Sequence, residues 1–548
     1  MKLLILALDG LDPGLVTRWG DDLPNLSFLR REGFFSPIAS TIPPMTFPAW
    51  STFLTGVNPG RHGIFDFTER RPGYLKLRFI NATRRRYPTF LKLISNQGFR
   101  VGSIGLPTTY PPEALSGYQI SGFDTPVPSR ADCSYAHPRG LADEINENLG
   151  GYFFGNFNES RIGSSWHSKV LRLLREGIER KVRLVQFLER RIPLDLLLLH
   201  VSETDTVGHH YWAFCDDRSP RHLPTRDRDV ADAVHLIYQA ADDLVGKVIR
   251  ICEPETTIII SDHGMGGTSN RILYLNRFLA ERGFLKFTES FFPSMVGKLK
   301  SWGLKWMPYR FQQQVFKILN GWVASEIESA LRFGGIDWGK TQAYSEELNY
   351  YPAVYLHCKG RDPFGIVTGD QVAEVRDRVV QALLDWRDPL DGTRIVRNVH
   401  CKEEVYSGPE IESAPDLILE LNQPEGYSYA LGRTLFASNR SAWRLMKPDE
   451  YLGCKGASMN GSHRKNGTFL LHGAEFKYTP PPDFSLMDVA PLIFRIFLLN
   501  APYWLEAERS SSTFVDPMEN PVGGREYKTY TLEEEASLQR QLTRLGYY

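Results

Sequence analysis

The sequence predicts an α/β fold in which a mostly parallel central sheet is covered by helices on both faces. Short apolar runs alternate with longer amphipathic stretches, which is typical of strands joined by crossover helices. Polar residues gather where the apolar runs end. The chain has 548 residues, 42% of them hydrophobic. At roughly 150 residues per domain, this length indicates more than one structural unit.

The predicted elements of the first 200 residues follow this rhythm. Residues 2–8 (KLLILAL) form the first strand, and residues 49–56 (AWSTFLTG) form a short helix that ends at Gly56. Residues 89–107 (TFLKLISNQGFRVGSIGLP) are predicted as helix, turn and strand. Leucine and valine at helical spacing over residues 168–191 predict a long helix before Pro193, and the strand LDLLLLHVS follows.

The rhythm continues to about residue 270 and then changes. A helix is predicted over residues 228–252, and the strand-forming run TTIIISDHG follows it. Residues 284–340 are rich in aromatics and lysines. They fit either a helical cap packed on the main domain or an amphipathic helix on a membrane surface. Strand signals return at YPAVYLHC, APDLILEL and GTFLLHG.

These changes suggest a division of the chain. We expect a catalytic core, a helical cap insertion, an α/β portion that completes the core or the cap, and a polar tail. Their respective boundaries are 1–270 plus 455–505, 271–340, 341–454, and 506–548.

Charge and cysteine content restrict the class of protein. Lys+Arg and Asp+Glu both number 64, so the net charge is zero, which argues against a nucleic-acid polymer as partner. The six cysteines form no C-x-x-C pair, and this sparse use favours a reducing compartment, so we expect a cytoplasmic protein. We find no apolar run of about 20 residues, and therefore expect no membrane span.

Two candidate sites follow predicted strands in the first half of the chain. Asp9 comes directly after the first strand, where a carboxylate is either a turn former or a metal ligand. Asp205 and His209 are four residues apart, so a helix would place both on one face. Such a pair suits a divalent cation of the zinc type, whereas the neighbouring His210 would point elsewhere.

A third candidate site is TTIIISDHGMGG, where Asp262 and His263 end a buried strand. Both side chains reach one metal only if the backbone turns sharply, and the glycines that follow would permit such a turn. The alternative is that Asp262 caps a turn and His263 is exposed. His463 is the fourth candidate, in a glycine-containing loop before a strand, where a lone histidine usually has no special role.

Together, these sites offer three aspartates and three histidines. That is enough for two divalent cations, which at a separation of about 3.5–4 Å clamp the attacking and leaving oxygens of a phosphoryl transfer. Thr46, in IPPMTFPAWSTF, supplies a nucleophile. Because Pro48 suits a first helical turn, Thr46 should lie near a helix N-terminus, which favours negative charge. Capping of that helix by the Thr46 hydroxyl is equally compatible.

In these motifs the chain resembles the alkaline phosphatase superfamily, in its type I phosphodiesterase/nucleotide pyrophosphatase branch. The resemblance covers most of residues 1–270 and about 340–500, and GFDTP and DVAPLIF bring it closest to a group described as predicted phosphohydrolases or phosphomutases. The matching motifs, in chain order, are LALDGLD, TFPAWSTFLTGVNPGRHGI, SETDTVGHHYW, IIISDHGMGG and GSHRKNGTF.

The resemblance implies an alkaline-phosphatase-like α/β/α sandwich with inserted cap elements and two divalent cations, usually zinc and sometimes manganese. It implies that Thr46 attacks phosphorus to form a phosphothreonine, which water then hydrolyses to release phosphate or a phosphomonoester. The implied ligands are Asp205, His209 and His463 for one metal, and Asp9, Asp262, His263 and Thr46 for the other.

One position departs from the family pattern. The nucleotide pyrophosphatases carry a phosphate-binding asparagine three residues after the nucleophile, and here that residue is Ala49. A cation could substitute, and the candidates are Arg61, Arg84 and Arg464, each of which could instead be a solvated surface arginine. The arginine of the sulfatase C/S-x-P-x-R motif is absent from TFPAW, which argues against a sulfatase.

We therefore expect a metal-dependent phosphohydrolase that acts on a small phosphorylated substrate, either a monoester or a diester. A phosphomutase would share the first half-reaction but return the phosphoryl group to a retained product. A catalytically silent, metal-stabilised binding protein is a third possibility, and the presence of all six ligand candidates and Thr46 argues against it.

Overall fold

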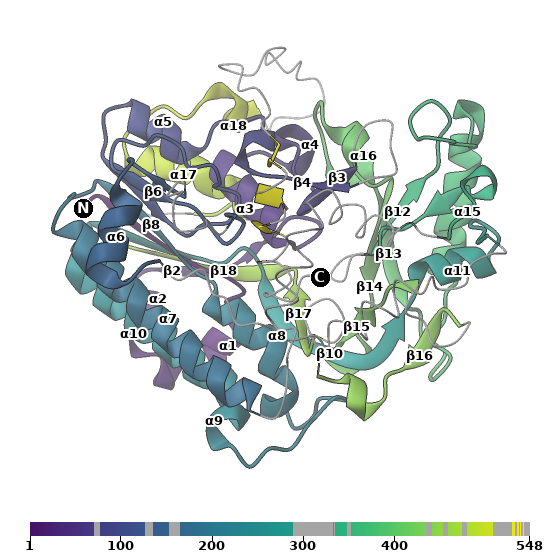
Figure 1. The fold of residues 1–548 in the computed structure, drawn as a ribbon, viewed down its shortest axis with the longest axis horizontal. Coiled ribbons are helices and arrows are strands. Elements are labelled where there is room, and N and C mark those ends of the chain that lie inside the picture. Colours follow the sequence, from purple (N-terminus) through teal and green to yellow (C-terminus); the bar gives the residue numbers. More distant parts are fainter. Residues whose placement is uncertain are drawn as a thin grey trace.

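The structure is a computed structural model of the 548-residue chain. It describes all residues except 71–76, 127–134, 153–164, 289–332, 334, 348–351, 435–440, 453–458, 474–478, 508–528, 532–533, 536, 539–540 and 542–548. Within the described residues, two packed parts face each other, one built on a large sheet and the other on a smaller one (Figure 1).

The large sheet has eight strands, and its centre is parallel. Strand β1 pairs in parallel with β8 on one side and β9 on the other, and all six residues of β1 are buried. The predicted α/β fold with a mostly parallel sheet is therefore confirmed. In spatial order the strands are β2 (Phe34–Ala39), β18 (Asn466–His472), β9 (Thr256–Ile260), β1 (Leu3–Leu8), β8 (Leu196–Val201), β5 (Val101–Ile104), β6 (Tyr118–Ile120) and β7 (Ala136–His137).

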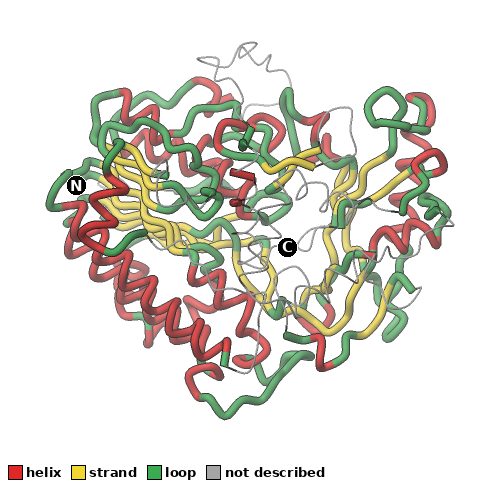
Figure 2. Tube along the Cα trace, viewed as in Figure 1, coloured by secondary structure: helices red, strands yellow, loops and turns green. Residues whose placement is uncertain are grey.

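Helices cover both faces of this sheet (Figure 2). Because side chains alternate along a strand, Leu4 and Leu6 of β1 belong to one core, and Leu3 and Ile5 belong to the other. The first core contains α2 (Pro24–Glu32), α7 (Trp166–Glu189) and α10 (Ala233–Cys252). The second contains α3 (Thr46–Thr55), α5 (Phe90–Asn96) and α17 (Val489–Ile496).

The smaller part is built on a four-stranded sheet and its own core. Helix α15 (Val372–Leu384) and helix α11 (Leu275–Glu281) pack into that core. In spatial order the strands are β11 (Ala343–Tyr344), β12 (Ala353–Leu356), β14 (Leu417–Leu421) and β13 (Val396–Cys401). The domain boundaries given above stay a prediction. Most of the segment 284–340 lies outside the described residues, so both interpretations of it stay open.

Strand β10 (Gly264–Leu273) leads from the large sheet to the smaller part. It pairs with β15 (Ser428–Leu431), β16 (Trp443–Leu445) and β17 (Gly461–Arg464). The expectation that the glycines after His263 form a turn is wrong, because Gly264, Gly266 and Gly267 lie in this strand. A Cβ on Gly264 would lie 2.3 Å from the Asn466 carbonyl oxygen, so close packing explains the glycine.

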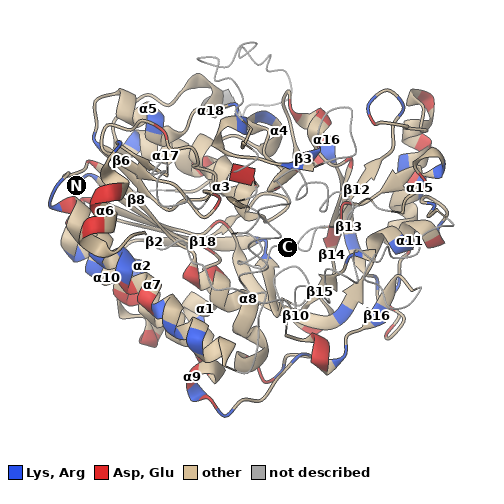
Figure 3. Cartoon of the chain, viewed as in Figure 1, with Lys and Arg blue, Asp and Glu red and all other residues tan. Residues whose placement is uncertain are grey.

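Charged residues of both signs lie along the outer helices of the described chain. Figure 3 shows Lys/Arg and Asp/Glu interspersed on α7 and α10, as expected for a chain of zero net charge. A search of the described helices for one long and apolar enough to cross a bilayer finds none.

Candidate active site

The predicted ligands lie at one edge of the large sheet. Strands β1, β8 and β9 are parallel neighbours, so their carboxyl ends meet there. Asp9 follows β1, and Asp262 and His263 join β9 to β10. Asp205 and His209 lie on α8 (Glu203–Cys215), which begins just after β8.

His463 reaches this edge from β17. That strand pairs antiparallel with β10 and places His463 opposite Met265. The expectation that His463 lies in a loop is therefore wrong: it lies within a strand. The four motifs, which are up to 454 residues apart in the sequence (Asp9 to His463), are brought together by sheet pairing.

Asp9, Asp262 and His263 form one group of potential ligands. Their ligand atoms all lie within 4.8 Å of one another. His263 Nε2 is 3.2 Å from Asp262 Oδ2 and 3.5 Å from Asp9 Oδ1. Both Asp262 and His263 have an exposed fraction of 0%, which contradicts the alternative of an exposed histidine beside a turn.

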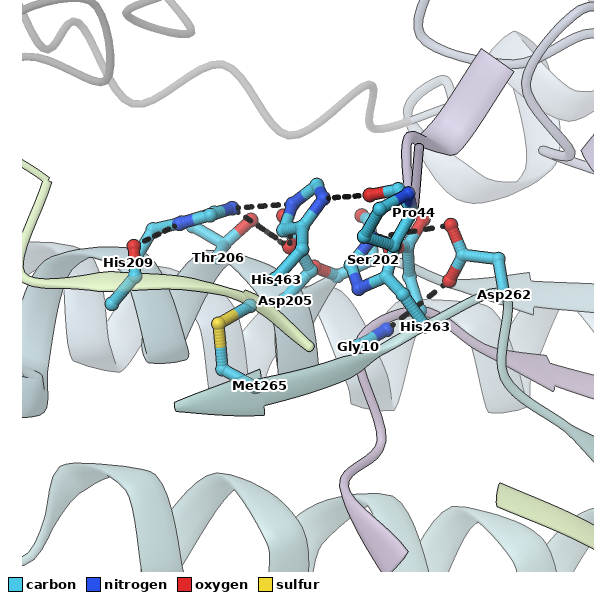
Figure 4. Close-up of polar contacts among 12 residues, drawn as sticks. Gly10, Pro44, Ser202, Asp205, Thr206, His209, Asp262, His263, Met265 and His463 are labelled. Atoms are coloured by element: carbon cyan, nitrogen blue, oxygen red, sulfur yellow. Dashed lines mark hydrogen bonds and ion pairs between the residues drawn. The ribbon is translucent and has the colours of Figure 1, made fainter. Parts of the chain in front are cut away.

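Asp205, His209 and His463 form the adjoining group (Figure 4). His209 Nε2 lies 2.9 Å from Asp205 Oδ1 and 3.1 Å from His463 Nε2. The rings of His263 and His463 stack with their centroids 3.5 Å apart. The ligand atoms of Asp205, His263 and His463 likewise all lie within 4.8 Å of one another. His263 therefore lies between the two groups.

The backbone fixes how these three imidazoles are oriented. The Nδ1 atoms of His209, His463 and His263 lie 2.8, 2.7 and 3.0 Å from the carbonyl oxygens of Gly461, Pro44 and Gly264. A carbonyl oxygen only accepts, so each Nδ1 carries the proton. Each Nε2 therefore presents a lone pair to the cluster, which is the tautomer that a metal-ligating histidine needs.

The electrostatics of the first group also suit a cation. Burial, together with the Asp9 and Asp205 carboxylates, raises the pKa of Asp262 well above its ordinary value. Burial, reinforced by His463, lowers the pKa of His263 to about 3, so that imidazole is neutral. Asp9 Oδ1, Asp262 Oδ2 and His263 Nε2 are buried, and no hydrogen bond from the described residues reaches any of them. Such atoms are costly in a protein interior, and a divalent cation would satisfy all three.

Two residues that the sequence analysis missed hold Asp9 in place. His200 Nε2 and Trp50 Nε1 both donate to Asp9 Oδ2, over 2.9 and 3.2 Å. Burial alone would raise the pKa of Asp9, but the hydrogen bond from His200 helps to hold it below its ordinary value. With Oδ2 engaged in this way, Oδ1 faces His263. The signal in the sequence was a histidine inside the apolar run LDLLLLH.

Thr46 is the first residue of α3, and it is buried. The residue that caps the helix is Met45, with extended backbone and no capping side chain, so the alternative that Thr46 caps the helix is wrong. Among the described residues, no hydrogen bond involves the Thr46 hydroxyl. Trp50 lies one turn further along α3, so Thr46 shares the helix face that contacts Asp9.

All three candidate substrate-binding arginines are bound to the protein scaffold. Arg61 is only 5% exposed, donates to the Trp504 carbonyl over 3.3 Å and lies over the Tyr87 ring. Arg84 forms an ion pair with Glu69 at 2.7 Å and another with a second glutamate. The surface-arginine alternative is therefore wrong for Arg61, and a substrate contact by either residue stays a prediction.

Arg464, the third candidate, follows His463 in β17. Successive side chains of a strand point to opposite faces, so Arg464 points away from the side that His463 occupies. Its guanidinium donates to the carbonyl oxygens of Gly267 and Gly426 over 3.1 and 2.7 Å. Burial lowers its pKa to about 10. Its proposed contact with substrate also stays a prediction.

The comparison with protein families agrees with this geometry. The model of the type I phosphodiesterase/nucleotide pyrophosphatase family matches residues 3–434. The chain belongs to this family. As a family member it is a hydrolase of phosphoric ester bonds. A comparison with curated protein sequences found no match.

Two solved structures of one enzyme share the fold of this family member. Phosphonoacetate hydrolase from Sinorhizobium meliloti 1021, in complex with phosphonoformate, aligns with a TM-score of 0.52 at 14% identity, over 91% of this chain and 95% of that one. Its complex with phosphonoacetate gives a TM-score of 0.50 at 14% identity and the same two coverages, 91% and 95%. Human ectonucleotide pyrophosphatase/phosphodiesterase 5 aligns with a TM-score of 0.42 at 15% identity, over 92% of this chain and 98% of that one.

Proton release should accompany cation binding at Asp262. Because its pKa is raised, metal-free Asp262 keeps its proton at pH values above 3.8, and a cation must displace that proton. Between 3.8 and the raised pKa, zinc affinity should therefore increase with pH. Asp262→Asn should bind zinc more weakly and with a shallower pH dependence. Calorimetry in two buffers of different ionisation enthalpy measures the proton count, with the exposed-site variant Asp243→Asn as control. Equal proton release from wild type and Asp262→Asn would contradict this assignment.

Removing the hydrogen-bond donor at His200 should weaken zinc binding by the group of Asp9, Asp262 and His263. His200→Leu fits the leucine-rich strand but leaves one donor on Asp9 Oδ2, and we expect a roughly 10–100-fold loss of zinc affinity. His200→Gln keeps an N–H of similar reach and should recover most of that affinity. Competition with a coloured chelator measures both. His472→Leu, at a histidine that packs on Phe28, is the control. Wild-type affinity in His200→Leu would show that the hydrogen bond does not position Asp9.

Proposed function

We propose that the chain hydrolyses phosphate esters through a phosphothreonine formed at Thr46, with two divalent cations held by the clustered ligands. The observation that carries this proposal is the convergence of three imidazole Nε2 atoms and three buried carboxylates beside the N-terminus of α3. One cation would be held by Asp205, His209 and His463, and the other by Asp9, Asp262 and Thr46, with His263 between them. Nitrogen and oxygen ligands of this kind fit zinc, and manganese is the second choice.

Cations bound there would lower the pKa of the Thr46 hydroxyl and offset the charge of the transferred phosphoryl group. The chain's own contribution is orientation. The first hydrogen bond of α3 runs from the Ala49 N–H to the Met45 carbonyl, and Pro48 has no N–H. The N–H groups of Thr46 and Phe47 therefore have no acceptor within the helix and favour negative charge at its N-terminus. The contact of Trp50 with Asp9 holds this helix against the ligand group.

In the proposed reaction, the Thr46 hydroxyl gives its proton to water and Oγ1 forms a bond to phosphorus. The bond from phosphorus to the ester oxygen breaks, and that oxygen leaves with a proton from water. A second water molecule then attacks phosphorus, the bond from phosphorus to Oγ1 breaks, and Oγ1 takes a proton from the attacking water, which restores the hydroxyl. The product is inorganic phosphate from a monoester or a phosphomonoester from a diester.

The proposed role of Thr46 predicts a distinct pair of variants. Thr46→Ala should lower kcat for p-nitrophenyl phosphate by at least roughly 10³-fold, because the attacking oxygen is removed. Thr46→Ser keeps an oxygen in the same place and should retain most of the turnover. Metal content by plasma mass spectrometry should stay near wild type in both, since the six other ligands remain. Wild-type turnover in Thr46→Ala would rule out the nucleophile.

Metal removal should abolish the same activity reversibly. Dialysis against a chelator should remove hydrolysis of p-nitrophenyl phosphate, and zinc or manganese should restore it. Magnesium should restore less, because it prefers oxygen ligands and this cluster offers three nitrogens. Hydrolysis that continues in fully metal-free protein would contradict the two-cation proposal.

A further inference from the structure

A large cavity lies between the two parts of the chain and adjoins the segment that carries Thr46. Its volume is about 810 Å³, which is within the range of small-molecule sites. One wall comes from the core, with strands β3 (Thr68–Arg70) and β4 (Leu77–Phe79). The opposite wall comes from β12 and from residues 406–413 of the smaller part.

One short stretch of backbone separates this cavity from the ligand cluster. The side chains of Pro43 and Met45 line the cavity. The carbonyl of Pro44, between them, accepts the hydrogen bond from His463 Nδ1 over 2.7 Å. Thr46 follows directly and begins α3. Thr46 thus directly follows a residue that lines the cavity. The organic part of an ester bound at Thr46 would therefore lie next to this cavity.

Charged side chains of the two walls are paired with one another. Glu69 accepts from Arg78 and Arg84 at 2.7 Å each, and Arg84 also pairs with Glu410 of the opposite wall, as does Arg86. The described residues that line the cavity include seven Arg and Lys and eight Asp and Glu, so the lining has no excess of positive charge of the kind that attracts a polyanion.

A second set of ion pairs joins Arg70, in the core wall, to residues of the smaller part. Arg70 pairs with Asp362 at 2.7 Å and with Glu346 at 3.6 Å. Its guanidinium lies 4.1 Å from the ring centroid of Tyr355, and Tyr406 also lines the cavity. The cavity walls therefore offer guanidinium groups as hydrogen-bond donors beside carboxylates as acceptors, together with the faces of aromatic rings.

That combination suits a neutral ring or chain with many hydroxyl groups. Each hydroxyl both donates and accepts, so neighbouring hydroxyls can bond to a guanidinium and a carboxylate that lie side by side. The apolar C–H face of such a molecule packs on aromatic rings. We propose that the cavity binds the sugar or polyol part of the substrate, so that the substrate class is sugar and polyol phosphates. This inference rests on the proposed hydrolysis at Thr46.

Filling the cavity from its exposed rim should separate this class from other esters. Ser413 lines the cavity and is exposed, so Ser413→Trp narrows the site without altering the ligand cluster. Glu403→Trp places the same side chain on the exposed surface of the neighbouring helix α16 (Lys402–Val405) and is the matched control. A second variant, Glu410→Gln, keeps the shape and removes the charge that pairs Arg84 and Arg86.

The assay compares glucose 6-phosphate and glycerol 1-phosphate with n-hexyl phosphate, adenosine monophosphate and p-nitrophenyl phosphate. Wild type should show at least tenfold higher kcat/KM for the two polyol esters than for the hexyl ester. Ser413→Trp should raise KM for the polyol esters at least tenfold, whereas kcat for p-nitrophenyl phosphate should stay within twofold of wild type because Thr46 and the ligand cluster are unaltered. Glu403→Trp should have the same KM for the polyol esters as wild type. Glu410→Gln should have a KM for these esters between those of wild type and Ser413→Trp.

Binding without turnover keeps the two proposals distinguishable. Saturation-transfer NMR with methyl glucoside and glycerol as probes should show contact in wild type and not in Ser413→Trp, whether or not any ester is cleaved. Lack of p-nitrophenyl phosphate hydrolysis would overturn the proposed function while leaving this binding result to stand. A preference for the hexyl ester over the two polyol esters, or equal loss on all substrates in Ser413→Trp, would overturn the cavity assignment.

Discussion

Three buried carboxylates at the ends of neighbouring strands are the constraint on which the rest of the site depends. Asp9, Asp205 and Asp262 all lie at one edge of the sheet, and burial, together with the proximity of the other two carboxylates, raises the pKa of Asp262. Like charges in a dry interior repel strongly unless a cation or a proton lies between them. Three imidazoles present lone pairs to the same space, so the cluster is built to hold positive charge.

The fold supplies this constraint through strand pairing. Parallel pairing of β1 with β8 and β9 places the carboxyl ends of the three strands side by side. The antiparallel pairing of β10 with β17 brings in His463 from the far end of the chain. Asp9 then links this edge to α3 through Trp50, so the position of Thr46 depends on the same carboxylate that belongs to the ligand group. Ligand geometry and nucleophile geometry are in this way coupled.

Most of the large sheet and the candidate cluster could be predicted from the sequence. Runs such as LLILAL and TTIII show strands directly, and the i, i+4 spacing of Asp205 and His209 shows a shared helix face. His200 was missed because a histidine inside an apolar strand gives no sign of its partner, Asp9, which directly follows the neighbouring strand and is 191 residues away in the sequence. The glycines of β10 were misread as a turn because a lack of space for Cβ depends on contacts that are remote in sequence. The arginines illustrate the same limit, since their ion pairs and carbonyl partners come from distant segments.

Whether the cluster holds two cations can be seen by anomalous X-ray diffraction from crystals grown with zinc. Data collected on both sides of the zinc absorption edge should show two peaks, one beside Asp205, His209 and His463 and the other beside Asp9 and Asp262, with His263 between them. No peak at these six residues, or zinc bound only elsewhere on the surface, would contradict a two-cation site in this cluster.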